Sequence, residues 1–315
     1  MANSISRLKV SILGVIGLLF GLSALAVPGK IPLALTFDDL PASGPEAAEI
    51  TREQAMDLIL QALKKHKVPP VYGFLTGQLA DNMEGRKKLL VRWKEAGHLI
   101  GNHGFSHLDL SKTNSADYIA DIAKNEPLLI DYASTIKELK VFRYPFLMEG
   151  DSHDKRYAVR SYLSRRQYQI AQVSVDFQDW HFYEAWMKCQ GQEDNQRQLE
   201  DEFILFAKQR LTTYHQVGQY IFGANRELPH ILLLHLTPLT AKLLDRLLSE
   251  FTKMGVRWIS ADQAIRHPLY QEDTALEMKS GGMGFLDQAL QSRKLKFKWP
   301  KNHILPKNKL LSLCP

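Results

Sequence analysis

The segment Leu33-Ala34-Leu35-Thr36-Phe37-Asp38-Asp39 decides how this sequence folds. Its apolar residues form an unbroken run, which is typical of a strand buried on both faces of a sheet. Two aspartates follow directly at the end of the run. A glycine-rich dinucleotide fingerprint is absent at this position, so the acidic strand end indicates chemistry other than dinucleotide binding.

The same alternation of short apolar runs and longer amphipathic stretches continues along the chain. Seven segments read as strands, at residues 33–38, 71–75, 99–102, 141–144, 170–175, 230–234 and 257–260. Six stretches between them have helical spacing, at residues 46–65, 86–96, 116–137, 155–165, 196–214 and 238–253. Strands that alternate with helices predict an α/β fold with a parallel sheet. This pattern alone allows either a barrel or an open, doubly wound sheet.

Residues 1–26 differ from the rest of the chain. Arg7 and Lys9 precede an apolar run at 10–25, and Ala24-Leu25-Ala26 matches a cleavage signal, so we expect a secretory signal peptide. An uncleaved membrane anchor is the alternative, because the run approaches the roughly 18–20 residues that span a bilayer. We expect the remainder to be exported, to the periplasm, the cell envelope or the medium, with no stable membrane insertion after cleavage.

The formal net charge is +6, and it falls to +4 once Arg7 and Lys9 are removed with the leader. A positive charge suits an anionic partner such as a cell-wall polymer. Nucleic acid is not expected, because no basic helix or arginine cluster with interleaved aromatics occurs before the lysine-rich tail. An ordinary solvated surface is the simpler account of these charges. The oligomeric state is left open by the sequence.

We divide the chain after the leader into a catalytic domain, residues 27–280, and a basic tail, residues 281–315. Gly281-Gly282-Met283-Gly284 lacks the Lys-Ser/Thr of a phosphate-binding loop and reads as a linker. We expect the residues beyond it to wrap around the domain. Cys189 and Cys314 are the two cysteines, and in an oxidising compartment they are able to pair.

Ionisable residues gather where the predicted strands end. They are Asp38 and Asp39 after the first strand, His103 and His107 after the third, Arg143 at the fourth, Asp176 and Asp179 after the fifth, and His235 at the sixth. Parallel strands open their carboxyl ends onto one face, where active sites collect. Eight ionisable residues from five strands are therefore expected to lie together on this face of the fold.

Three of these residues suit a metal ion. His103 and His107 are spaced i and i+4, which on a helical turn places both imidazoles on one side. With Asp39 they make a two-histidine, one-carboxylate set that leaves positions for water and substrate. Zinc favours such a set, and non-haem iron or cobalt also accepts it.

The chain resembles the polysaccharide deacetylases of the NodB-homology type, a carbohydrate esterase family, over about residues 31–266. Five motifs carry the resemblance: Thr36-Phe37-Asp38-Asp39, Gly101-Asn102-His103-Gly104-Phe105-Ser106-His107, Arg143-Tyr144-Pro145-Phe146, Asp176-Phe177-Gln178-Asp179-Trp180 and Leu233-Leu234-His235. The resemblance implies a distorted (β/α) barrel with about seven parallel strands and an active site at their C-terminal face. It also implies metal-dependent hydrolytic N-deacetylation of a polysaccharide that contains N-acetylhexosamine.

The resemblance also implies a role for each motif residue. Asp39, His103 and His107 hold a divalent metal, with Zn²⁺ expected first and Co²⁺, Fe²⁺ or Ni²⁺ as alternatives. Asp38 is the general base, and Arg143 orients it.

The remaining roles concern the leaving group and the acetyl group. His235 protonates the departing amine, and Asp179 holds its imidazole. The backbone N–H of Phe146 binds the oxyanion, while Trp180 and Leu233 wall the acetyl pocket, although such residues at strand ends often belong to the core.

Two departures from the family pattern leave the substrate open. Gly104 stands where a serine or threonine would brace the loop, and Phe146 replaces a common tyrosine. Peptidoglycan or an exopolysaccharide is the expected substrate. The alternatives are an acetyl-xylan ester or a small amide, and a catalytically inactive carbohydrate-binding protein. Asp176 is expected to be structural.

Overall fold

The structure is a computed structural model that describes residues 31–81, 84–133, 135–224, 226–305 and 307–313. The predicted leader lies outside the described residues. The strands are β1 (Ile31–Leu40), β2 (Tyr72–Leu75), β3 (Leu99–Asn102), β4 (Val141–Phe142), β5 (Gln169–Ile170), β6 (His230–His235) and β7 (Val256–Trp258). Each falls at or beside one of the seven predicted strands.

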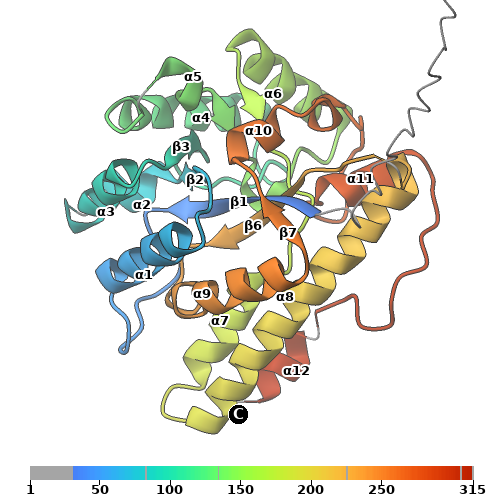
Figure 1. The fold of residues 1–315 in the computed structure, drawn as a ribbon. Coiled ribbons are helices and arrows are strands. Elements are labelled where there is room, and N and C mark those ends of the chain that lie inside the picture. The colour runs from blue at the N-terminus through green and yellow to red at the C-terminus, as the bar shows by residue number, and fades with distance from the viewer. Residues whose placement is uncertain (1–30, 82–83, 134, 225, 306, 314–315) are drawn as a thin grey trace, which may run out of the picture.

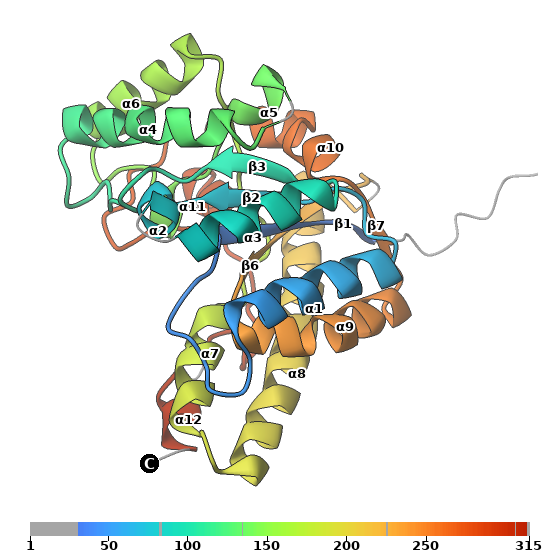
Figure 2. The ribbon, with the colours of Figure 1, turned by 90° about the vertical axis from the view of Figure 1, so that its left-hand side faces the viewer.

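The helices surround this sheet (Figures 1 and 2). They are α1 (Arg52–Lys65), α2 (Gly77–Asp81), α3 (Glu84–Glu95), α4 (Ser115–Ile130), α5 (Ile136–Leu139), α6 (His153–Arg165), α7 (Asp179–Lys188), α8 (Glu193–Phe222), α9 (Pro238–Lys253), α10 (Ala261–Ile265), α11 (Phe285–Ser292) and α12 (Lys307–Ser312), with the 3₁₀ turns η1 (Pro145–Leu147) and η2 (Pro268–Gln271). None of these described helices has both the length and the apolar character needed to cross a membrane.

Several helices differ from their predicted bounds, and the stretch predicted at 116–137 ends as α4 at Ile130. The first helix was expected from residue 46 but begins at Arg52, because Thr51 forms a capping box with Gln54. The predicted helix at 196–214 is the middle of α8, which runs for 30 residues.

The sheet is parallel and curls into a half-barrel, which confirms the predicted fold class. Its order is β5-β4-β3-β2-β1-β6, and β7 pairs with the start of β1. The segment after β5 was expected to continue that strand to residue 175. Instead it leaves β4 and reaches β6, where Val175 forms a parallel bridge with Leu232. This crossing brings the two edges of the curled sheet together.

Burial of β1 fixes the position of the site. Leu33, Leu35 and Phe37 are fully buried, and Phe37 packs edge-on against Trp93 of α3. Because β1 pairs with β2 and β6 at its carboxyl-terminal half, the aspartates that end it emerge between two neighbouring strands. The strand that the sequence singled out thus pairs with three others, β2, β6 and β7.

The segment from Met278 to Phe285 is packed into the fold. Met278 and Phe285 are fully buried, and the Phe285 N–H donates to the Val173 carbonyl at 2.6 Å. The glycine-rich segment lies between these two anchors. Cys189 at the end of α7 is buried. Cys314 lies outside the described residues, so the pairing of these two cysteines stays a prediction.

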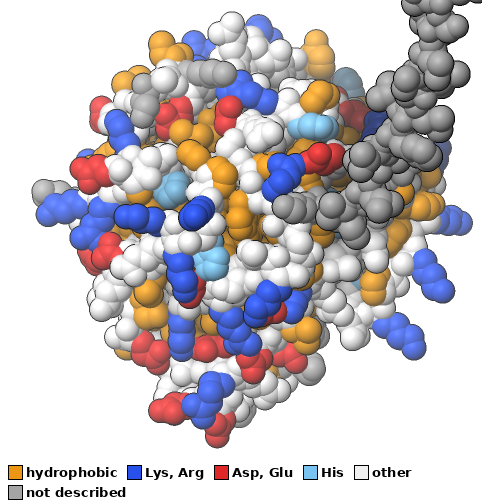
Figure 3. Space-filling view, viewed as in Figure 1, with side chains coloured by type: hydrophobic (Ala, Val, Ile, Leu, Met, Phe, Trp, Pro, Cys, Tyr) orange, Lys and Arg blue, Asp and Glu red, His pale blue; other side chains and the backbone are white. Residues whose placement is uncertain are grey.

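The surface carries both signs of charge. On the face that Figure 3 shows, lysine and arginine side chains are interspersed with aspartate and glutamate, with no large patch of one sign. This distribution is that of an ordinary solvated surface.

Candidate active site

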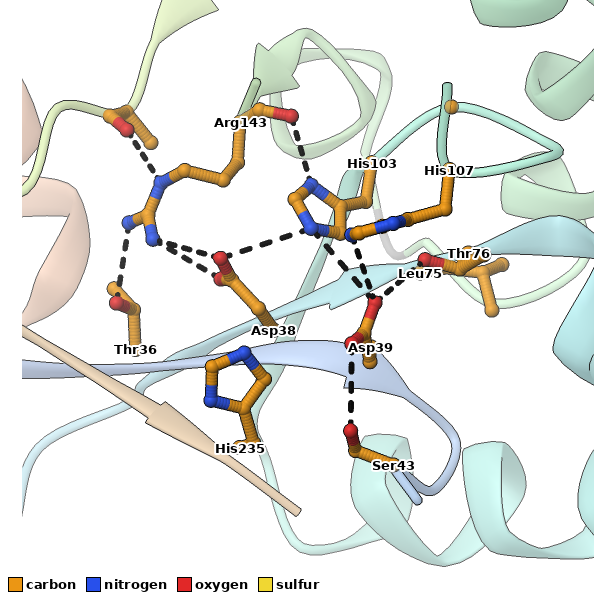
Figure 4. Close-up of polar contacts among 12 residues, drawn as sticks. Thr36, Asp38, Asp39, Ser43, Leu75, Thr76, His103, His107, Arg143 and His235 are labelled. Atoms are coloured by element: carbon orange, nitrogen blue, oxygen red, sulfur yellow. Dashed lines mark hydrogen bonds and ion pairs between the residues drawn. The ribbon is translucent and has the colours of Figure 1, made fainter. Parts of the chain in front are cut away.

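The two aspartates at the end of β1 point to different partners (Figure 4). Asp38 is buried and faces Arg143, while Asp39 is partly exposed and faces His103 and His107. Asp39 has a left-handed backbone with φ 59°, which turns the chain sharply after the strand. Adjacent residues of a strand normally point to opposite faces, and this turn lets both carboxylates reach the same mouth.

Arg143 is held on every side of its guanidinium. It donates to both oxygens of Asp38 at 3.0 and 3.2 Å, to the Thr36 hydroxyl at 3.1 Å and to the Ala171 carbonyl at 2.5 Å. Its guanidinium also lies over the Phe74 ring. Because both charged groups are almost fully buried, loss of either would leave the other uncompensated.

Asp39, His103 and His107 come together as the sequence predicted. The Asp39 Oδ1 lies 3.4 Å from the His107 Nε2 and 3.9 Å from the His103 Nε2. One ligand atom from each residue lies within 4.8 Å of the others. Zn–N and Zn–O bonds of about 2 Å fit between atoms at such separations.

The hydrogen bond of His103 prepares it to be a ligand. Its Nδ1 lies 2.8 Å from the Arg143 carbonyl oxygen, so Nδ1 carries the proton and donates it there. Nε2 then carries the free lone pair, on the side that faces Asp38 and Asp39. Burial lowers the pKa of His103 to about 4 against the opposing effect of Asp38, so the imidazole is neutral at neutral pH. Metal-binding histidines commonly show this arrangement.

The loop from His103 to His107 is irregular, so the predicted helical turn is wrong. Gly104 and His107 both have a left-handed backbone, at φ 75° and 54°. The loop is held from α4 instead. The Asp121 carboxylate accepts from the Phe105 N–H at 2.8 Å and from the Ser106 N–H at 3.0 Å.

Asp121 also explains the glycine at position 104. A Cβ there would lie 2.7 Å from the Asp121 Oδ2, too close for a real contact. The missing serine or threonine hydroxyl is thus replaced by a carboxylate that occupies the same space. Asp121 lies in a predicted helix 14 positions after His107, so no short motif pointed to it.

His235 and Asp179 form a second pair beside the aspartates. The His235 Nδ1 lies 2.7 Å from the Asp179 Oδ1, and the other Asp179 oxygen accepts from the His235 N–H and the Thr240 hydroxyl. Burial alone would lower the pKa of His235. The buried Asp179 carboxylate outweighs it, with Asp39 and Asp38 adding to the effect, and raises that pKa to about 10.

A pocket of about 850 Å³ opens over these residues. Phe146, Trp180 and Leu233 all line it, and the exposed Phe146 ring lies edge-on to the His107 ring, with 4.4 Å between the ring centroids. The Phe146 N–H has no acceptor in the described part of the chain. Leu233 is nearly buried, whereas Trp180 is 42% exposed at the rim.

The pocket also includes residues that sequence reasoning missed. Gly282, Met283 and Asp287 of the C-terminal segment line it, together with Arg210 and Tyr214 of α8. Glycine and methionine carry no chemical signature, and the pattern of α8 is that of an ordinary amphipathic helix. Asp176 lines the pocket and accepts from the Gln178 N–H at 2.7 Å, a contact that shapes the turn before α7.

The Asp121 contacts predict a test of the metal site. Asp121→Asn weakens the brace on the loop that carries His103 and His107, so we expect the affinity for zinc to fall of the order of 10- to 100-fold. Calorimetric titration with zinc measures this. Asp131→Asn, at the exposed end of the same helix, is the control and keeps the wild-type affinity. Equal affinities in both variants would contradict the bracing role.

The His235–Asp179 pair predicts a titration. Asp179→Asn removes the main cause that raises the pKa of His235, which should fall toward 6.5 in an NMR titration of the metal-free protein. Because the folded pKa is the higher one, the pair stabilises the fold fully below about pH 6.5 and loses this contribution as pH rises toward 10. A His235 pKa that the substitution leaves unchanged would show that another group controls it.

Comparison with known proteins agrees with this geometry. Residues 26–163 match the family model of the polysaccharide deacetylases. The peptidoglycan-N-acetylglucosamine deacetylase of Bacillus cereus is 34% identical over 151 residues, which are 48% of this chain and 47% of that protein. The peptidoglycan-N-acetylmuramic acid deacetylase of Bacillus subtilis is 41% identical over 63 residues, 20% of this chain and 22% of that protein. The chain thus spans about half, or less, of the length of these relatives.

Solved structures share the fold. A CE4 family pseudoenzyme from Bacillus anthracis superposes with a TM-score of 0.51 at 18% identity, over 76% of this chain and 66% of that one. A mutant CE4 family pseudoenzyme with restored enzymatic activity superposes with a TM-score of 0.53 at 20% identity, over 76% of this chain and 69% of that one. The polysaccharide deacetylase family model thus matches residues 26–163, the part of the chain that contains the first three of the five motifs.

Proposed function

We propose that this protein hydrolyses N-acetyl groups of a polysaccharide that contains N-acetylhexosamine, outside the cytoplasm and with a divalent metal. One observation carries the proposal. Two sets of side chains, the cluster of Asp38, Asp39, His103 and His107 and the pair of His235 and Asp179, meet at one pocket. This is the arrangement that acyl transfer to water needs, with a base, an acid and an electrophilic centre within reach of one carbonyl group.

The donor set fits a divalent cation. Two imidazole nitrogens and one carboxylate oxygen are the ligands of many catalytic zinc sites, and three protein ligands leave positions for water and substrate. Zinc is our first proposal, with Co²⁺, Fe²⁺ or Ni²⁺ as alternatives. When bound there, the metal would polarise the acetyl carbonyl and acidify a water molecule.

Asp38 is the proposed general base. Its Oδ2 lies 3.7 Å from the His103 Nε2, beside the ligand set that Asp39, His103 and His107 form. Arg143 holds the carboxylate in that orientation through two hydrogen bonds. Asp38 takes a proton from the attacking water as the C–O bond forms.

His235 is the proposed general acid. Its pKa, raised to about 10 by Asp179, keeps it protonated at neutral pH. Nδ1 is committed to Asp179, which leaves the Nε2–H to donate to the amide nitrogen as the C–N bond breaks. The products are acetate and the free amine of the sugar.

The remaining residues fit the acetyl group. The Phe146 N–H, which has no acceptor among the described residues, is the proposed donor to the tetrahedral oxyanion. Leu233 and Trp180 offer apolar surface for the methyl group. The exposed rings of Trp180 and Phe146 suit contact with sugar rings at the rim.

The substrate proposal rests on the relatives. Two curated relatives are named for deacetylation of peptidoglycan N-acetylglucosamine and N-acetylmuramic acid, so we propose peptidoglycan first and an exopolysaccharide second. Export to the envelope follows from such a substrate. We retain residues 1–26 as a signal peptide and 27–280 as the catalytic domain. Residues 281–315 are the basic tail, part of which completes the pocket wall.

Three substitutions test the assignments. Asp38→Asn and His235→Ala should retain metal and lose about 10²- to 10⁴-fold in turnover, since each removes one proton-transfer group. His103→Ala should lose both metal and turnover. Acetate release and elemental analysis of the same preparations measure these effects. Wild-type turnover in Asp38→Asn would refute the base assignment.

A panel of substrates tests the reaction class. Acetate release is compared on peptidoglycan, chitin oligomers, acetylated xylan and a simple acetamide, with the His103→Ala protein as the blank. We expect release from the N-acetylhexosamine polymers. Release from xylan alone would make the protein an esterase, and tight binding without release would favour a binding protein with an inactive site.

A further inference from the structure

The C-terminal segment lies against the turn that carries Phe146. We call residues 278–288 the strap and residues 144–150 the third-motif turn. The Met278 N–H donates to the Gly150 carbonyl at 2.9 Å, and the Met283 N–H donates to the Leu147 carbonyl at 3.3 Å. The strap is therefore bonded to the turn at two points.

The third-motif turn is strained where it faces the pocket. Phe146 and Leu147 are consecutive residues with φ of 58° and 53°, in the left-handed region that residues other than glycine seldom adopt. Such a conformation persists only where surrounding contacts enforce it. Both residues line the pocket.

Gly282 supplies the closest of these contacts. A Cβ at this position would lie 1.8 Å from the Phe146 carbonyl oxygen and 2.7 Å from the Leu147 carbonyl carbon. The strap backbone thus packs directly on the turn, without a side chain between them. Gly282 itself does not have a positive φ, so its role is close approach and not conformational freedom.

The strap is fixed at its other end by α11. The Gln288 amide donates to the Met283 carbonyl and to the buried Glu149 carboxylate, both at 3.0 Å. Glu149 in turn accepts from Arg156 and Arg160 of α6. These bonds join the strap, the turn and the domain into one network.

We propose that the strap is a positioning element for the reaction, which holds the strained turn so that the Phe146 N–H meets the developing oxyanion. This inference rests on the proposed deacetylation. It assigns a role to residues far beyond position 163, where the match to the family model ends. Gly282 and Gln288 act through Phe146 and touch no reacting atom.

Gly282→Ala tests the proposal in the full-length protein. The added methyl must displace backbone, while Asp39, His103 and His107 are left in place. We expect the metal content to stay at the wild-type level, kcat to fall about 10- to 100-fold and KM to change little, since removal of a whole oxyanion donor costs about 10²- to 10³-fold. Kinetics are measured per metal-loaded molecule, well below the unfolding temperature of each variant.

Gly85→Ala is the matched control. Gly85 lies in α3 with open space around its Cα, so this variant should keep wild-type kinetics. Gln288→Met is the second variant, which loosens the strap without crowding the turn. Gln288→Met should also lower kcat with little change in KM. It tests the strap even if Gly282→Ala does not fold.

The outcomes distinguish the positioning role of the strap from the proposed deacetylation itself. Wild-type kcat in a folded Gly282→Ala or Gln288→Met protein would overturn the positioning role, as would a rise in KM at unchanged kcat. Failure of the wild-type and Gly85→Ala proteins to release acetate from any polymer would refute the proposed function itself.

Discussion

The buried ion pair between Arg143 and Asp38 is the contact on which the rest of the site depends. It neutralises one of two adjacent carboxylates at the end of β1 and thereby leaves the other free for the histidines. The same guanidinium bonds to Thr36 and Ala171, so it also joins β1 to the segment after β5. The His103 imidazole is bonded to the carbonyl of this same arginine. One residue of β4 thus orients the proposed base and one proposed ligand together.

Strained backbone gathers around this centre. Asp39 near the end of β1 has positive φ, as do His107, Phe146 and Gln178 in the segments that follow β3, β4 and β5. Left-handed residues other than glycine are uncommon and cluster at functional sites. Contacts from residues outside the motifs, such as the Asp121 carboxylate and the strap, offset the free-energy cost of these backbone conformations. A site assembled from five loops therefore needs a scaffold larger than the motifs themselves.

Sequence patterns predicted most of the strands, because burial on both faces leaves an unbroken apolar run. They predicted the meeting of Asp39, His103 and His107 for a topological reason, since parallel strands end on one side. They failed where tertiary contacts decide the backbone. The loop after β3 was expected to be a helical turn, but Gly104 and Asp121 impose another path. Gly282 read as a linker, because close approach between two backbones leaves no pattern in one sequence.

The most direct test of the account is whether the folded chain binds a cation at this cluster. An ion that binds the folded state alone raises the unfolding temperature, by a stabilisation of about 2.7 kcal/mol at a ligand concentration 100 times Kd. The measurement is the unfolding temperature of the metal-free protein with and without added zinc. The account predicts a clear rise that His103→Ala abolishes. An unfolding temperature that zinc leaves unchanged in the wild-type protein would contradict it.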